Sequence, residues 1–198
     1  MLLLAGCGTT GYRKIGSGQT YELPCEKVSF AQTKGPTCGP EAIAQVCKFW
    51  GIEANARELV NQTSDGQING SRLGALREWA EAHGLKSQLY HGCPQDLAEK
   101  IAAGMPVIAV LDVNRYPRLP HPFIQKIFWG HAVVVVGFDD NSREVILCGG
   151  GEESRMSYSA FFKEWQATEW VTLLLWPDKE VLPEGTPQTP DGRSMQSP

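Results

Sequence analysis

The order of two hydrophobic periodicities along the chain is the feature that most restricts its fold. Up to about residue 103, apolar residues recur at helical spacing, whereas after residue 106 they gather in short valine-rich runs bounded by Gly and Asp. The helical segments are 38–50, 55–62, 71–83 and 94–103. The runs typical of buried strands are 107–111, 132–138, 145–147 and 171–176, with an amphipathic stretch at 157–165 before the last. This order predicts an α+β fold with N-terminal helices packed on an antiparallel sheet.

Composition excludes several classes of protein. The 198 residues suit one domain, and 42% hydrophobic residues with a net charge of −4 are typical of a globular chain. No basic stripe of a nucleic-acid binder is visible. No C-x-x-C or H-x-x-x-H spacing occurs among the six cysteines and four histidines, so we expect neither a metal nor another cofactor.

The two ends differ in composition from the middle. Residues 1–7, MLLLAGC, resemble the lipobox of bacterial lipoproteins, in which the cysteine, here Cys7, becomes lipid-modified. Only six residues precede it, fewer than a signal peptide needs, so a frayed apolar terminus is the alternative. We expect a signal remnant and tether at 1–20, a domain at 21–177 and a disordered tail at 178–198. A lipid anchor would hold the domain in the cell envelope, outside the cytoplasm, on the outer membrane of a Gram-negative cell.

Cys38 opens the first predicted helix. A thiol attacks a carbonyl carbon as its thiolate, which a helix N-terminus and a neighbouring imidazolium stabilise. Gly39 leaves room for a substrate backbone, and the main-chain N–H of Cys38 or Gly39 can face a developing oxyanion. Taken alone, a cysteine at a helix start is more often a small buried hydrophobe. Its neighbours favour a nucleophile.

Two other residues complete a candidate site. Gln32, six residues before Cys38, can supply a side-chain N–H to an oxyanion hole, although a solvated loop glutamine is common. His131 begins the valine-rich strand after Gly130, so the sheet fixes it at the strand start. His83, His91 and His121 lack such a setting.

This array resembles the C39-like, bacteriocin-processing cysteine peptidases. The resemblance rests on Gln32, Cys38–Gly39, the helix after Gly70–Ser71, Met105–Pro106–Val107–Ile108, Gly130–His131–Ala132 and a closing Met156–Ser157 with Phe161 and Trp165. It implies a papain-like fold over about 21–176, with Cys38 as nucleophile, His131 as general base and Gln32 as oxyanion donor. Relatives cleave after a double glycine while fused to a transporter, and no transporter segment is visible here.

One member of the family pattern is missing. The family places an aspartate on the strand after the histidine strand, where it orients the imidazole. A hairpin centred near Asp140 and Asn141 puts that position at Cys148, which cannot replace a carboxylate. Three readings stay open: a backbone carbonyl or Ser154 orients His131, Glu152 or Glu153 reaches back, or catalysis is weak or lost. Asp139 and Asp140, at the hairpin tip, are expected to be solvated.

The sequence therefore predicts a peptidase that acts on a peptide or protein, bound to the membrane through its lipid. A non-catalytic peptide-binding lipoprotein and an acyl-transferring relative are the alternatives. The remaining domain cysteines are Cys25, Cys47, Cys93 and Cys148, and we expect buried free thiols, since disulfides beside a reactive Cys38 would risk mispairing.

Overall fold

The fold was determined as a computed structural model that describes residues 15, 18–25, 37–65, 70–112, 130–149 and 152–178. Its helices are α1 (Cys38–Phe49), α2 (Ala56–Thr63), α3 (Leu73–Ala82), α4 (Pro94–Ala102) and α6 (Tyr158–Ala167). Its longer strands are β4 (Leu85–His91), β5 (Val107–Leu111), β6 (His131–Asp139), β7 (Glu144–Gly149), β8 (Glu152–Ser157) and β9 (Val171–Pro177). Three short strands are β1 (Thr20–Glu22), β2 (Ser64–Asp65) and β3 (Gly70–Ser71).

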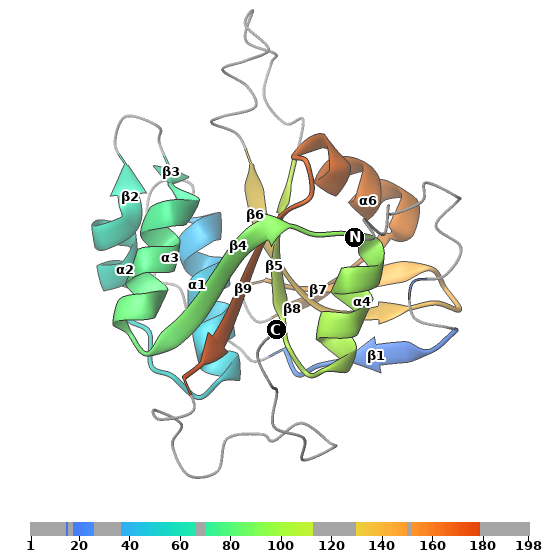
Figure 1. Ribbon diagram of the computed structural model, residues 1–198, viewed down its shortest axis with the longest axis horizontal. Helices are drawn as coiled ribbons and strands as arrows, with labels where there is room; N and C mark the ends of the chain where they lie inside the picture. Colours follow the sequence, from blue (N-terminus) through green and yellow to red (C-terminus); the bar gives the residue numbers. More distant parts are fainter. Residues whose placement is uncertain are drawn as a thin grey trace, which may run out of the picture.

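The main sheet has the order β4-β9-β5-β6-β7-β8, with β1 added on β6, and every pairing in it is antiparallel. In Figure 1, α1, α2 and α3 gather on one side of the molecule, and α4 and α6 lie on the other. The α+β fold with helices on an antiparallel sheet is confirmed. The sequence did not predict β1, β4 or β8.

Local sequence explains where the predicted helices begin and end. Asn55 caps α2, because its side chain accepts hydrogen bonds from the main-chain N–H groups of Arg57 and Glu58. α1 ends at Phe49, two residues before Gly51, whose φ of +71° suits a residue without a side chain. Pro94 occupies the first turn of α4, where its missing N–H costs nothing.

One core joins the two sides of the sheet. The helices bury apolar faces on strands whose residues are enclosed from both sides, as β5 is along its whole length. The largest fully buried side chains include Phe138, Phe161 and Trp165, each with less than 2% of its surface exposed. Because helices cover both faces of the strands, chemistry must lie at a strand end or a sheet edge.

A β-bulge divides β6 into two halves. Val134 and Val135 pair with Cys148 and Leu147, whereas Gly137 pairs with Ile146, so Val136 is an extra residue. The first half also pairs with β5, and the second half pairs with β1. β7 thus pairs with β6 from Val134 to Asp139, while β5 and β1 pair with the first and the second half of β6.

The turn between β6 and β7 corrects the expectation of a solvated carboxylate for Asp140, but not for Asp139, whose hydrogen bonds are exposed. Asp140 is only 3% exposed, and its carboxylate accepts hydrogen bonds of 2.8 Å from the Ile15 N–H, the Gly18 N–H and the Tyr158 hydroxyl. Burial and the bond to Asp140 raise the pKa of Tyr158. The carboxylate thus holds two residues upstream of β1, in the segment expected to be a tether, against the domain.

Candidate active site

Cys38 is the first residue of α1, a helix of 12 residues, and its side chain is partly exposed. The Thr37 carbonyl accepts the first helical hydrogen bond from the Glu41 N–H at 2.8 Å, and the Thr37 hydroxyl donates to the Glu41 carboxylate. The start of the helix is thereby fixed. The main-chain N–H groups there are the donors that a developing oxyanion can use.

Gly39 is required by packing rather than by backbone conformation. A Cβ on this residue would come within 2.7 Å of Leu76 Cδ1 in α3. α3 therefore presses closely on the first turn of α1, beside Ser71 of β3. This contact sets the position of the thiol relative to the helical side of the molecule.

His131 is the first residue of β6 and lies exposed opposite Leu111, the last residue of β5. Gly130, the preceding residue, is also closely packed, since a Cβ there would lie 2.3 Å from Val110 Cγ1. α1 packs against β6, and in Figure 1 the start of α1 and the start of β6 point toward the same end of the molecule. The predicted nucleophile and base are thus both at the beginning of their elements, at one end of the fold.

The other described histidines have structural roles. The His83 ring stacks on Trp79 with centroids 3.7 Å apart and bonds the Trp79 carbonyl through Nδ1. His91 bonds the Glu169 carbonyl in the turn before β9. Gln32 and Cys7, with His121, lie outside the described residues.

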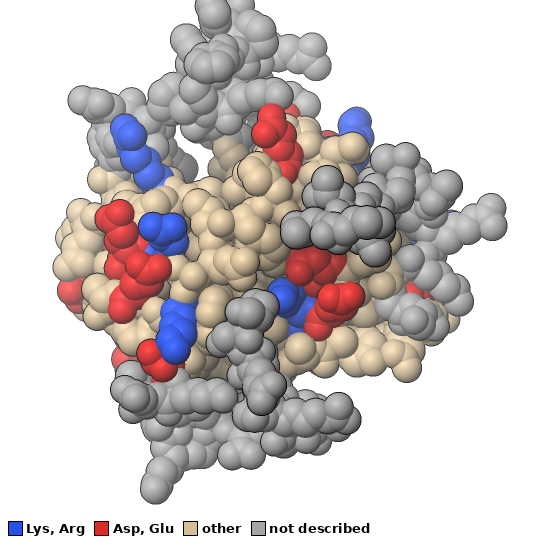
Figure 2. All heavy atoms as spheres, in the orientation of Figure 1, with Lys and Arg blue, Asp and Glu red and all other residues tan. Residues whose placement is uncertain are grey.

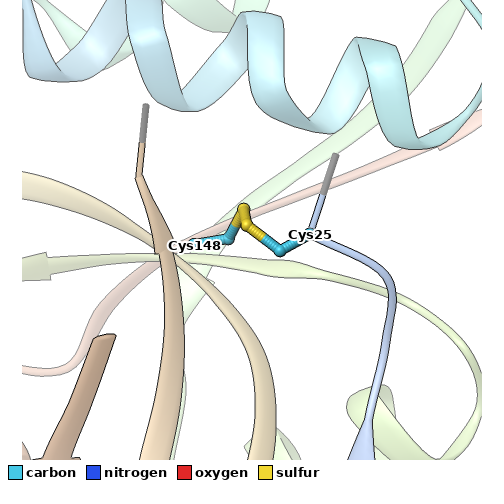
Figure 3. Close-up of a disulfide and its surroundings, with 2 residues drawn as sticks. All are labelled: Cys25 and Cys148. Atoms are coloured by element: carbon cyan, nitrogen blue, oxygen red, sulfur yellow. A yellow bond between two sulfur atoms is a disulfide. The ribbon is translucent and has the colours of Figure 1, made fainter. Parts of the chain in front are cut away.

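The cysteines contradict the expectation of free thiols at two positions. Cys25 and Cys148 form a disulfide with their Cα atoms 5.5 Å apart, although 123 residues separate them (Figure 3). Cys47 is a buried free thiol, and burial raises its pKa to about 12. Cys93, at the start of α4, is partly exposed. Cys38 and Cys93 are therefore the two free thiols with exposed surface in the described parts of the chain.

The register corrects the third position of the predicted triad. Cys148 pairs with Val134, so its side chain shares a face of the sheet with Val134 and lies on the face opposite to that of His131. The Cys148 sulfur is also bonded to Cys25, so it is not a free thiol. Continuing the register by one residue sets Gly149 opposite Val133, on the face of His131. Hairpin counting missed this position for two reasons: the turn is centred between Asn141 and Ser142, one residue later than assumed, and the bulge at Val136 has no signal in the sequence.

Among the described residues, no group of three His, Cys, Asp or Glu side chains is placed to hold a metal ion. No described helix is both long and apolar enough to cross a bilayer. Figure 2 shows Lys and Arg lying beside Asp and Glu on the face in view. Ion pairs among the described residues include Arg77–Glu81 and Lys100–Asp96.

Comparison with known proteins identifies the class. The model of the Peptidase_C39-like family matches residues 26–172, which is most of the chain. The chain therefore belongs to the C39-like peptidase family, and its fold is that of a papain-like cysteine peptidase. No curated protein sequence matches it.

Solved structures agree on the fold. A C39-like peptidase from Bacillus anthracis has a TM-score of 0.62 at 15% identity, covering 81% of this chain and 98% of that one. A double glycine motif protease from a transporter, in complex with its leader peptide, has a TM-score of 0.57 at 15% identity and covers 79% and 95%. The peptidase domain of Streptococcus ComA, a bifunctional ABC transporter, has a TM-score of 0.54 at 17% identity and covers 80% and 98%.

Proposed function

We propose that this protein is a peptidase in which Cys38 attacks the carbonyl carbon of a peptide bond. The observation that carries the proposal is the common location of Cys38 and His131, each the first residue of its element, at one end of a fold whose α1 packs on β6. His131 takes the thiol proton, and the sulfur–carbon bond forms. The main-chain N–H of Cys38 and the side chain of Gln32 donate to the oxyanion.

The second half of the reaction returns the enzyme to its starting state. The carbon–nitrogen bond breaks, the leaving amine takes the proton from His131, and a thioester remains on Cys38. Water then attacks the thioester with His131 as base, which releases the new carboxylate. An amine in place of water would give acyl transfer, and product analysis distinguishes the two outcomes.

Alkylation of the cysteines tests the pair directly. Iodoacetamide below pH 7, followed by mass spectrometry of tryptic peptides, is expected to label Cys38 fastest, and His131→Ala is expected to abolish that advantage. Cys93 is the matched control, because it is also partly exposed and begins a helix. Equal slow labelling of Cys38 and Cys93 would sink the proposal.

Gln32 is tested by turnover. Gln32→Ala removes one oxyanion donor and is expected to lower kcat by roughly a hundredfold or more. The readout is the hydrolysis of a library of unstructured peptides. An unchanged kcat would remove Gln32 from the mechanism and leave the Cys38–His131 pair standing.

A non-catalytic peptide-binding protein is the second candidate. It is favoured by one observation: Gly149 stands on β7 where a carboxylate would share the face of His131. Under this alternative, peptides bind with an affinity that calorimetry can measure, and Cys38→Ala does not change that affinity. Neither the parent protein nor the variant hydrolyses the peptides.

We further propose that the domain is lipid-anchored through Cys7 and works outside the cytoplasm. The Cys25–Cys148 disulfide supports this location, because such bonds persist in oxidising compartments. The test is incorporation of radiolabelled palmitate into the full chain in a bacterial host. Cys7→Ala should eliminate the label, and equal labelling of the variant would contradict the anchor.

A further inference from the structure

The β7–β8 ladder brings one acidic side chain onto the face of His131. Gly149 pairs with Glu152, and Cys148 pairs with Glu153. Residues paired across an antiparallel ladder share a face, and neighbours along a strand alternate. Glu152 therefore lies on the same face as Gly149 and His131, whereas Glu153 lies on the face of Cys148.

Ion pairs on the other face support this assignment independently. Arg155 lies on the face of Glu153, and it pairs with Glu144 of β7 at 4.0 Å and with Glu22 of β1 at 3.4 Å. Across the ladders, Arg155 of β8 pairs with Ile146 of β7, and Ile146 pairs with Gly137 of β6. Gly137 in turn pairs with Glu22 of β1, so all four residues share one face. The contacts agree with the alternation derived from the ladders.

Gly149 of β7 lies between Glu152 and His131 on this face. Among the residues that the structure describes, a Cβ built on Gly149 meets no heavy atom within 4 Å, and Gly149 has no left-handed backbone that would forbid a side chain. The residue between the two side chains thus has no side chain of its own. A long carboxylate on the neighbouring strand can extend over it.

Distances along the sheet make the reach feasible. Strands about 4.8 Å apart with a rise of about 3.4 Å per residue put the Cα atoms of Glu152 and His131 about 12 Å apart. A glutamate and a histidine leaning toward each other span about 9 Å with bonds of about 1.5 Å, which leaves about 3 Å for a hydrogen bond. Ser154 shares the face but lies opposite Leu147, two residues farther from His131, and its side chain is too short.

We propose that Glu152 is the positioning residue for His131, replacing from the next strand the carboxylate that β7 lacks. This inference rests on the proposed function of the Cys38–His131 pair. Glu152 accepts a hydrogen bond from the imidazole during turnover, which fixes the ring orientation and favours the imidazolium formed when Cys38 ionises. An exposed carboxylate is partly screened by water, so its contribution is smaller than that of a buried one.

Glu153→Gln provides a matched control for Glu152→Gln. Both changes remove one negative charge from adjacent exposed positions of β8, on opposite faces of the sheet. Peptide hydrolysis is measured for both variants across pH, with thermal unfolding to check the fold. Glu152→Gln is expected to lower kcat about five- to tenfold with KM unchanged, and to move the basic limb of the rate profile to lower pH. Glu153→Gln is expected to behave as the parent protein.

Rescue separates positioning from a general effect of charge. In the Glu152→Gln background, Gly149→Asp adds a carboxylate where there is room for it, and it is expected to restore kcat, whereas Gly149→Asn is not. Equal rates for Glu152→Gln and Glu153→Gln, or equal rates with Asp and Asn at position 149, would overturn the inference. His131→Ala is run in parallel: if it retains full activity, the proposed function itself fails, whatever the result at Glu152.

Discussion

The two ends of β6 are built in opposite ways. At the Asp139 end lie the buried carboxylate of Asp140, the β1 ladder and the close-packed Gly137. At the His131 end, the histidine is exposed, and a Cβ on the nearby Gly149 would meet no heavy atom of the described residues within 4 Å. The bulge at Val136 lies between them. The difference teaches that this strand uses one half for stability and leaves the other half accessible for chemistry.

The largest expected effect is at the accessible end. Cys38→Ala removes the proposed nucleophile and is expected to lower peptide hydrolysis by at least about a thousandfold. Because Cys38 is at a helix start and partly exposed, the melting temperature should change little. A large fall in melting temperature together with retained hydrolysis would show that Cys38 has a structural role and not a catalytic one.

The disulfide gives the next largest effect, on stability. Replacing Cys25 and Cys148 together by Ala removes a crosslink over 123 residues and is expected to cost about 4 kcal/mol of unfolding free energy. Denaturant unfolding measures it. Cys38 should keep its rapid alkylation under native conditions, since the bridge lies on the face opposite to that of His131. Loss of that rate in a folded double variant would show that the two ends are coupled.

Asp140→Asn tests the closed end. The amide accepts hydrogen bonds more weakly than the carboxylate and turns an N–H toward other donors, so we expect a loss of about 2–3 kcal/mol of unfolding free energy. Tyr158→Phe, which removes one of the donors to Asp140, should cost about 1 kcal/mol. Both variants should retain kcat, and a changed kcat would contradict the division of β6.

Two glycines provide a matched pair for packing. A Cβ on Gly137 would come within 2.5 Å of the Tyr21 carbonyl oxygen, whereas one on Gly149 meets nothing. Gly137→Ala is expected to destabilise the protein by about 1–3 kcal/mol, and Gly149→Ala by less than about 0.5 kcal/mol. Thermal unfolding of the two variants measures this difference. Equal melting temperatures would contradict the expected difference in packing between Gly137 and Gly149.

The smallest effect is the pH dependence of Asp139. Hydrogen bonds from the Asn141 N–H and the Thr20 hydroxyl hold the pKa of Asp139 below its usual range. The stability that this provides is present above the pKa of an unfolded aspartate and is lost as the pH falls through the folded one. Asp139→Asn should remove this part of the acid limb in urea unfolding between about pH 5 and pH 2. An identical acid limb in the variant would exclude the contribution.

The elements that the sequence predicts well are those buried against apolar side chains. The predicted strand at 107–111 coincides with β5, because a strand buried on both faces is a continuous apolar run. β8, with the sequence EESRMS, is mostly exposed and has no hydrophobic pattern, so it could not be predicted. The disulfide was missed because pairing depends on the fold, and the face of Cys148 was wrong because one bulge residue inverts the alternation.

The partner of β1 has a consequence for biosynthesis. Thr20 pairs with Asp139, so this strand must wait for about 119 further residues before its partner leaves the ribosome. At about 5–20 residues per second, that delay is on the order of 6–24 s. The Cys25–Cys148 bond can form only later still. During that interval the segment around β1 is unpaired and accessible to factors that bind nascent chains. Pairing of β1 with β6 then ends that accessibility.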